Sequence, residues 1–482
     1  MNWRRFAPNP MPCGQTRRQM FWETAGGFAG LALLDRLARD RLLATDASIP
    51  SHAPHFAPKA TRAVFLFMNG GPSQVDTFDP KPQLEKYHGT SYSGPLAVGS
   101  NGRPVGHLTK SFFPFQQHGE SGLPISSIYP HLAHHADSLA VIRSMHSDTA
   151  AHASGCLQMN SGSVFIGKPA LGSWLSYGLG TLQENLPSFV VMTDPRGGPI
   201  GSASNWSSGY MPANLQGTLF RSGNPPLLDL ATPQGTTDQT QRDGLDLLHQ
   251  LNSIHLEGRP GESELAARLE SYELAFRMQT AATEAVDLQR ETAETRQLYG
   301  IDDPRTADFG QKCLITRRLL ERGVRFIQLY SGGGHIEDTW DGHNDCRTNH
   351  LTHAGETDQP IAALITDLKR CGLWEETLLI WGGEFGRTPT SEGVDKPGRD
   401  HDWHGFTMWL AGGCIRGGQA IGATDELGFA AVEEPCHVRD LHATILHAMG
   451  LDHQLLTYFH QGLDQRLTGI EQEARVFHQV FA

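Results

Sequence analysis

Short runs of apolar residues recur along the chain, and each run ends at glycine or at polar residues. The first, Ala63 to Met68, is continuously apolar and is followed by Asn69-Gly70-Gly71-Pro72. An uninterrupted apolar run bounded by turn residues is typical of a buried strand in a parallel sheet. Similar runs predict further strands at residues 139–142, 189–192, 326–330, 378–381 and 407–410.

Helical periodicity fills much of the sequence between these runs. Apolar residues spaced three and four apart predict helices at 308–321, 359–371 and 438–449. A longer periodic segment at 262–299 predicts another helix, and with the Gly-, Pro-, Ser- and Asn-rich stretch before it this segment predicts an insertion at about 195–300. Most of the strands are far enough apart for helical crossovers. The pattern therefore predicts an α/β fold with a mostly parallel sheet.

The composition is that of a globular protein, and it excludes one class of partner. The 482 residues carry a formal net charge of -13 without a basic run, whereas a nucleic-acid-binding protein needs a basic stripe. The seven cysteines show no C-x-x-C spacing. Six of them follow Cys13, and this even number permits disulfides in an exported protein. The 24 histidines, many of them after position 330, indicate metal or proton chemistry.

The N-terminal segment has the features of an export signal. A twin-arginine pair at 17–18 precedes a weakly apolar run at 25–34, which predicts a Tat signal over residues 1–45. A Pro-, Ser- and His-rich linker at 46–60 and a main domain at 61–482 follow. The apolar run is shorter than the roughly 20 residues that span a bilayer. We expect a periplasmic or extracellular protein, which an uncleaved leader could anchor to the membrane; a basic turn before an amphipathic helix is the alternative interpretation.

Polar residues directly after the predicted strands are candidates for chemistry, because ligands of open α/β sheets bind beyond the carboxyl ends of the strands. Asn69 and Asp76 follow the first strand. Asp341 and His343 follow the strand at 326–330 and, two residues apart in an extended loop, can point to the same side. A carboxylate with an imidazole supplies two ligands for zinc or a similar metal. For Asn69 and Asp76, the alternative is an ordinary Gly-Pro turn. For Asp341 and His343, it is a solvent-exposed polar loop.

Two later loops carry further candidates. Glu384 follows the strand at 378–381, and Arg387 could hold an oxyanion bidentately unless these two side chains form an ion pair with each other. The segment Asp400-His401-Asp402-Trp403-His404 has the densest group of acids and histidines in the chain. It predicts a ligand or proton-transfer role for at least one of His401 and His404.

The segment after the strand at 139–142 turns into a predicted helix and offers a nucleophile. A nucleophile at a helix N-terminus is stabilised by the helix dipole and by free N–H groups. The candidates are Thr149, His152 and Ser154, and spacing alone does not rank them.

Taken in order, these motifs resemble the DUF1501 family, a group of exported proteins in the alkaline phosphatase and sulfatase superfamily. The resemblance is carried by the leader and by NGGPSQVDTFDPKP at 69–82, WDGHND at 340–345, GGEFGRTP at 382–389 and GRDHDWHGFTMWLAGG at 398–413. It implies a three-layer, alkaline phosphatase-like sandwich with one or two divalent metals, for which zinc, calcium and manganese are the candidates. It also implies a small anionic ester or a sulfated or phosphorylated glycan as substrate.

The resemblance also assigns roles residue by residue. Around the metal it places Asn69 or Asp76, Asp341 with His343, Glu384, and His401 or His404, and it puts His152 at the nucleophile position. Ser154 and Arg387 remain catalytic candidates from the residues alone. The sulfatase C/S-x-P-S-R element is missing, because His152 takes its first position and no Pro or Arg follows where required. This departure argues against the formylglycine route. Two hypotheses remain: a metal-dependent hydrolase of phosphate or sulfate esters, and a noncatalytic binding or assembly protein with a degraded site.

Overall fold

The computed structural model describes residues 53–482 except 101, 222–225, 228–234, 258–262, 336–337, 392, 394 and 471–472. The described residues belong to one compact unit, His52–Ala482. The export signal expected at 1–45 and the first part of the expected linker lie outside the described residues. The last part of that linker runs along helix α12 (Val438–Ala448), where the N–H groups of Lys59 and Ala60 donate to Ala448 O at 2.8 and 2.9 Å.

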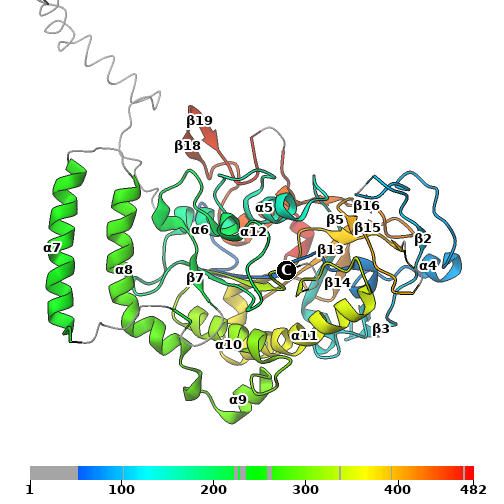
Figure 1. Ribbon diagram of the computed structural model, residues 1–482, viewed down its shortest axis with the longest axis horizontal. Coiled ribbons are helices and arrows are strands. Elements are labelled where there is room, and N and C mark those ends of the chain that lie inside the picture. The colour runs from blue at the N-terminus through cyan, green and yellow to red at the C-terminus, as the bar shows by residue number, and fades with distance from the viewer. Residues whose placement is uncertain are drawn as a thin grey trace, which may run out of the picture. The chain divides into compact units, whose positions relative to one another are not determined.

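A mostly parallel sheet lies at the centre of this unit (Figure 1). Its strands follow the order β14-β5-β13-β9-β1-β8-β6-β7, and β17 pairs with β5. All its described strands run parallel except β13, which is antiparallel to both neighbours. In chain order they are β1 (Arg62–Met68), β5 (Leu139–His146), β6 (Phe189–Met192), β7 (Thr218–Phe220), β8 (Phe326–Ser331), β9 (Thr377–Gly382), β13 (Phe406–Ala411), β14 (Gln419–Ile421) and β17 (Cys436–His437).

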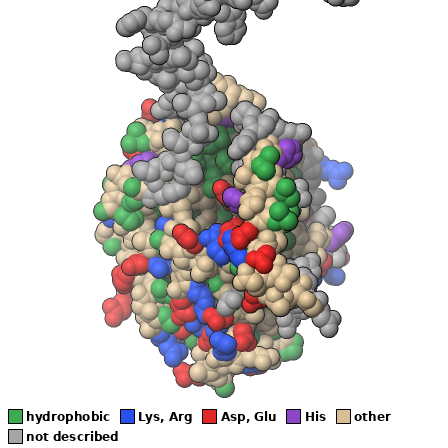
Figure 2. Space-filling model, turned by 90° about the vertical axis from the view of Figure 1, so that its left-hand side faces the viewer, with side chains coloured by type: hydrophobic (Ala, Val, Ile, Leu, Met, Phe, Trp, Pro, Cys, Tyr) green, Lys and Arg blue, Asp and Glu red, His purple; other side chains and the backbone are tan. Residues whose placement is uncertain are grey.

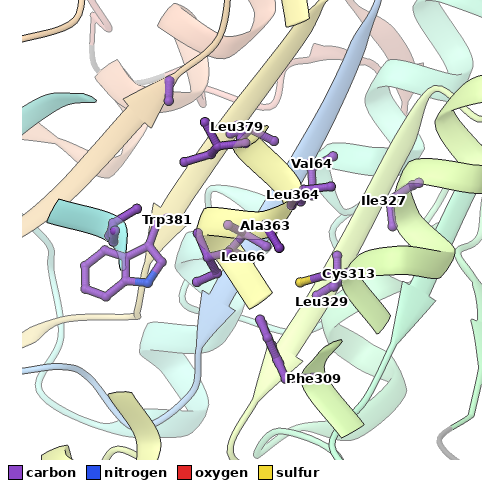
Figure 3. Close-up of a cluster of buried hydrophobic side chains, with 14 of the residues drawn as sticks. Val64, Leu66, Phe309, Cys313, Ile327, Leu329, Ala363, Leu364, Leu379 and Trp381 are labelled. Carbon is purple, nitrogen blue, oxygen red and sulfur yellow. The ribbon is translucent and has the colours of Figure 1, made fainter. Parts of the chain in front are cut away.

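Helices cover both faces of the sheet. One face carries α5 (His152–Ser161), α6 (Leu171–Leu179) and α12, and the other carries α10 (Ala307–Glu321) and α11 (Cys346–Arg370) (Figure 1). Because side chains alternate along a strand, β1 contributes to two cores. Val64 and Leu66 pack with α10 and α11 (Figure 3), whereas Phe65 and Phe67 belong to the core beneath α5, α6 and α12. Burial on both faces explains why the strands are apolar throughout, and the predicted sandwich is confirmed.

The segment between β7 and α10 is mainly helical. It contains α7 (Asp238–Glu257), α8 (Ser263–Val286), the short 3-10 helix η4 (Leu288–Arg290) and α9 (Ala293–Leu298). The prediction of one helix over 262–299 was wrong. The side chain of Asp287 accepts a hydrogen bond from Gln289 N, and that of Thr292 accepts one from Thr295 N, so each residue starts a new helical segment.

The start of α11 also differs from the sequence-based expectation. The helix begins at Cys346 rather than at residue 359. Asp345 caps its first turn, since its side chain accepts a hydrogen bond from Thr348 N. This earlier start brings the first turns of α11 close to the edge of the sheet where Asp341 lies.

Smaller elements complete the unit. The short helices are α3 (Gln74–Thr77), α4 (Pro82–Tyr87), η1 (Leu132–Ser138), η2 (Ser202–Trp206), η3 (Ala213–Leu215), η6 (Trp374–Glu376) and η7 (His478–Val480). Paired short strands are β2 (His107–Leu108) with β11 (Thr390–Ser391), β3 (Phe115–His118) with β4 (Leu123–Ser126), β10 (Gly386–Arg387) with β12 (His401–Asp402), β15 (Ala423–Thr424) with β16 (Ala431–Glu433), and β18 (Tyr458–His460) with β19 (Leu463–Gln465).

The surface and the cysteines bear on the remaining predictions. On the face in Figure 2, acidic and basic side chains are interspersed, and the described residues form no continuous basic stripe there. Among the described helices, none is long and apolar enough to cross a membrane. The cysteines of the described region are all free thiols, at positions Cys156, Cys313, Cys346, Cys371, Cys414 and Cys436.

A buried histidine between two helices makes the stability of the fold depend on pH. His442 on α12 is fully buried, and its Nε2 lies 2.8 Å from the carbonyl oxygen of Met159 on α5. Burial lowers the pKa of His442 to about 4. The unfolded chain, with a histidine pKa of about 6.5, therefore binds this proton first as the pH falls. The stability contributed by neutral His442 is complete above pH 6.5 and is lost as the pH falls toward 4.

We expect H442Q to flatten this part of the stability profile. Between pH 6.5 and pH 4, the free energy of unfolding of the wild type should fall by up to about 3 kcal/mol more than that of H442Q, as measured by urea denaturation. H249Q is the matched control, because His249 on α7 is exposed. Parallel profiles for the wild type and H442Q would show that His442 does not carry this dependence.

Candidate metal centre

Polar loops from distant parts of the chain meet at one edge of the sheet. The strands β1, β5, β8 and β9 are parallel, so the residues that follow them lie at the same edge. Because β13 is antiparallel, the loop that precedes it reaches this edge as well. The residues brought together are His152, Asp341, His343, Asp400 and His401, which we call the His–Asp cluster.

Asp341 lies at the centre of the His–Asp cluster. Its Oδ2 is 3.2 Å from His152 Nε2, and its Oδ1 is 3.3 Å from His343 Nε2 and 3.6 Å from His401 Nε2. The Nε2 atoms of His343 and His401 are 2.9 Å apart. Three imidazoles therefore face one buried carboxylate.

The cluster offers two overlapping sets of metal ligands. His152, Asp341 and His401 form one set, and His343, Asp400 and His401 form the other, each with ligand atoms within 4.8 Å of one another. His152 Nε2 and Asp341 Oδ1 are both buried and ion-paired: His152 Nε2 lies 3.2 Å from Asp341 Oδ2, and Arg387 Nη1 lies 2.7 Å from Asp341 Oδ1. Imidazole and carboxylate groups together suit zinc and similar divalent metals, so these residues fit a metal ion.

The surroundings of the cluster favour the charged forms of His152 and Asp341 and the neutral form of His401. Burial lowers the pKa of His152, but hydrogen bonding with Asp341 and Glu384 outweighs burial and raises the pKa to about 9. Burial raises the pKa of Asp341, but Arg387 and His152 outweigh it and hold this pKa well below its usual range. Burial lowers the pKa of His401 to about 4. Near neutral pH, Asp341 is therefore negative and His401 is neutral, as metal ligands must be, whereas His152 carries a proton that a bound metal would have to displace.

Glu384 holds His152 in place rather than joining the cluster. Its side chain is fully buried, and its Oε1 lies 2.6 Å from His152 Nδ1. Gly70 N–H donates to both carboxylate oxygens, at 3.0 and 3.1 Å. Gly70 has a φ of +111°, and a Cβ there would lie 2.6 Å from Asp341 N, so only glycine fits this turn. Glu384 was predicted as a ligand, but it lies behind His152 and directs the Nε2 of His152 toward Asp341.

Arg387 supports the site from within the core. Its guanidinium is fully buried, with Nε donating to Gly71 O at 2.9 Å and Nη2 donating to Gly70 O. Its Nη1 lies 2.7 Å from Asp341 Oδ1. Because its N–H groups are engaged by Gly70, Gly71 and Asp341, Arg387 cannot offer an oxyanion the two exposed N–H groups that the sequence had suggested. It instead orients Asp341 and fixes the glycine turn after β1.

Three other predicted ligands lie outside the His–Asp cluster. Asp76 is fully buried against Arg399, with a distance of 2.7 Å between Oδ2 and Nε. Asn69 bridges β1 to the loop after β8, because its Nδ2 donates to Gly332 O at 3.2 Å. His404 faces Asp402, with 3.6 Å between Nδ1 and Oδ1.

The hydroxyl groups considered as nucleophiles do not face the cluster. Ser154 is two residues after His152 in α5, so it is turned by about 200° around the helix axis. The helix face toward the site is occupied by Gly155, where a Cβ would lie 3.2 Å from Glu384 Cβ. Thr149 Oγ1 accepts a hydrogen bond from Ala151 N.

Asp400 is a cluster member that the sequence analysis did not single out. Its Oδ1 accepts hydrogen bonds from Ser100 Oγ and from His401 N, both at 2.7 Å. Its position next to His401, in the segment richest in acids and histidines, was the available signal. Spacing could not distinguish it from Asp402, which is buried away from the cluster beside His404.

Comparison with known proteins identifies relatives of the chain. Residues 60–481 match the model of the family described as "Protein of unknown function (DUF1501)". No curated protein matches the sequence significantly.

Similar solved structures include phosphatases and sulfatases. The alkaline phosphatase of the Antarctic bacterium TAB5 is 10% identical, with 82% of this chain and 99% of that chain covered and a TM-score of 0.33. The sulfatase PsFucS1 of Pseudoalteromonas sp. is 13% identical, with 86% and 73% covered and a TM-score of 0.36. The phosphonate monoester hydrolase of Silicibacter pomeroyi is 14% identical, with 67% and 68% covered and a TM-score of 0.29. At these values, the similarities carry no information about individual site residues.

Proposed function

Because the chain belongs to the DUF1501 family, we propose that it is an exported, metal-dependent hydrolase of phosphate or sulfate esters. The observation that carries this proposal is the set of His152, Asp341 and His401, whose ligand atoms lie within 4.8 Å of one another around a buried carboxylate. These atoms converge on one point at the carboxyl edge of the sheet, which is where open α/β proteins bind their ligands.

Each residue at this edge has a role in the proposal. His152, Asp341 and His401 hold the metal, with His343 and Asp400 available for a second ion. A bound divalent ion would polarise the ester and stabilise the charge that develops on its oxygens. Glu384 orients His152, and Arg387 orients Asp341.

The attacking group is water in this proposal. The predicted nucleophiles Thr149 and Ser154 do not face the His–Asp cluster, and both ring nitrogens of His152 face carboxylates. His152 is therefore not free to attack an ester. The side chain of His343 is 37% exposed, compared with 13% for His152 and 12% for His401, so His343 is the imidazole that substrate and water reach first.

A noncatalytic binding protein is the second candidate function. The observation that favours it is the position of the predicted nucleophiles: Thr149 Oγ1 accepts a hydrogen bond from Ala151 N, and Ser154 is turned away from His152 on α5. A protein of this kind would bind the metal and an anionic ligand without turnover. Metal content alone does not separate the two functions, whereas hydrolysis does.

Metal analysis combined with an ester panel tests the proposed function. The purified protein, supplied in turn with zinc, manganese and calcium, should retain at least one of them after gel filtration. It should also hydrolyse at least one of the 4-nitrophenyl esters of phosphate, phenylphosphonate and sulfate, with a rate that a chelator abolishes. Stoichiometric metal without turnover would favour the binding protein, and a protein that retains no metal would contradict both functions.

E384Q tests the orienting role of Glu384. Loss of the charge that fixes His152 should lower kcat or metal affinity by about 10–100-fold, as is typical of residues that support metal ligands. E433Q, which removes an exposed carboxylate on β16, should behave as the wild type. Full activity of E384Q with unchanged metal affinity would show that His152 needs no such support.

A further inference from the structure

A polar cleft opens beside the His–Asp cluster, and Asp341 and His343 form part of its wall. Its volume is about 270 Å³. This is just below the range of roughly 300–1,000 Å³ that is usual for ligand pockets. The cleft therefore has room for one small group next to the proposed metal position.

The charge that lines the cleft is negative. Asp338 and Asp345 contribute carboxylates in addition to Asp341. The cleft also contains Arg196, but its guanidinium is bound twice within the protein. Its Nε and Nη2 donate to Asp194 at 2.7 and 2.9 Å, and its Nη1 and Nη2 donate to Glu356 at 3.1 and 2.9 Å. The charge of Arg196 is thus already balanced, as is that of Asp341 by Arg387 and His152. Asp338 and Asp345 are therefore the carboxylates that would repel a second anionic group on a ligand.

Uncharged hydrogen-bonding groups also line the cleft. Thr348, Asn349 and Thr352 line the cleft from the first turns of α11. These positions share one side of the helix, because residues three and four apart lie next to each other. Thr352 Oγ1 donates to Thr348 O, so it offers a ligand an acceptor, whereas the Thr348 hydroxyl can both donate and accept. A carboxylate only accepts. These groups together match a ligand rich in hydroxyl groups, each of which donates and accepts.

We infer that the cleft binds the alcohol part of the ester, and that this alcohol is a neutral polyhydroxyl group of about one sugar unit. The inference rests on the proposed function, since it places the reacting ester at the His–Asp cluster and its leaving group in the cleft. It excludes polyanionic glycans because of the carboxylates. It also disfavours apolar alcohols, because hydroxyl, amide, carboxylate, imidazole and guanidinium side chains line this cavity.

Three esters that differ in one property test the inference. They are glucose 6-phosphate, 6-phosphogluconate, which adds one carboxylate, and hexyl phosphate, which lacks the hydroxyls; the corresponding sulfates serve if the enzyme prefers sulfate esters. The kcat/KM for the glucose ester should exceed both others by about 10-fold or more, which corresponds to about 1.4 kcal/mol. Equal or faster turnover of the gluconate or the hexyl ester would overturn the inference.

A matched pair of variants separates recognition from helix stability. Thr352 Oγ1 donates to Thr348 O and Thr366 Oγ1 donates to Ala362 O, both at 2.9 Å, in the same helix. The two positions are about 21 Å apart along the axis. T352V should raise KM for the glucose ester by about 5–10-fold without changing kcat/KM for the hexyl ester, because it removes one hydrogen bond to the sugar. T366V should change neither, and an equal effect of both variants would overturn the inference.

Binding measurements keep the inference distinct from the proposed function. Isothermal titration of the metal-loaded protein with the same three esters should show the same order of affinity, even without turnover. If none of the esters is hydrolysed but the glucose ester binds most tightly, the proposed function fails and the cleft assignment stands. Tighter binding of glucosamine 6-phosphate than of glucose 6-phosphate by more than about 10-fold would instead identify a site for cations and overturn the inference.

Discussion

D341N is expected to lose metal binding and hydrolysis together. Asp341 is the carboxylate that three imidazoles of the cluster face, and its side chain is almost fully buried. Loss of a residue that only supports a metal ligand typically costs about 10–100-fold in activity or affinity. Loss of the central ligand should cost more, so the expected decrease in kcat/KM exceeds about 100-fold. Metal content after gel filtration and turnover of the best ester measure the two losses.

Two further variants make the result for Asp341 interpretable. D395N is the matched control, because Asp395 is an exposed carboxylate in the loop before β12. H401Q removes a second proposed ligand without leaving the Arg387 guanidinium unpaired, so it separates loss of metal from loss of the fold. Thermal unfolding monitors the fold of each variant. Stoichiometric metal and full turnover in D341N would remove Asp341 from the metal centre.

R399M is expected to cause the largest loss of stability. Arg399 and Asp76 are both fully buried, and their side chains are 2.7 Å apart. Burial raises the pKa of Asp76, but Arg399 together with hydrogen bonds from Ser73 and Phe112 outweighs burial, so this pKa is lowered and the carboxylate is charged. Removing one partner of a buried ion pair leaves an uncompensated charge and typically costs about 3–5 kcal/mol. Urea denaturation of R399M should show a decrease of this size in the free energy of unfolding.

The double variant D76N/R399M tests the electrostatic cause. It removes both charges, so it should recover part of the stability lost in R399M. Folded D76N should retain the metal content of the wild type, because Asp76 lies outside the His–Asp cluster. A stability of R399M within about 1 kcal/mol of the wild type would contradict the role of this ion pair. Metal loss in folded D76N would restore Asp76 as a candidate ligand.

The six strands that the apolar runs predicted are all present, because a strand covered by helices on both faces needs apolar residues at every position. The helix boundaries were less predictable. Periodicity continues from α8 into α9, and only the caps at Asp287 and Thr292 separate the segments. Capping depends on whether one side chain reaches a nearby N–H group, and sequence periodicity does not register this.

The candidate site shows a similar division. Asp76 and Asp341 both follow strands and carry the same functional group, yet one pairs with Arg399 and the other faces three imidazoles. Glu384 and Arg387, close in sequence, were considered as an ion pair with each other. In the fold, Glu384 binds His152 and Arg387 binds Asp341. Arg387 and Asp341 are 46 residues apart, and Glu384 and His152 are 232 residues apart, so local spacing cannot choose among such partners.

By itself, the sequence determined the family, the apolar strands and the residue types that gather after them, since these follow from short motifs and local patterns. Only the tertiary structure decided which of those residues face one another. The strand order places the loops after β5, β8 and β9 at one edge, and the reversed direction of β13 adds His401 and Asp400 to that edge. Interactions between charged groups depend on distance in space and on burial, and both are set by the packing of strands far apart in the chain.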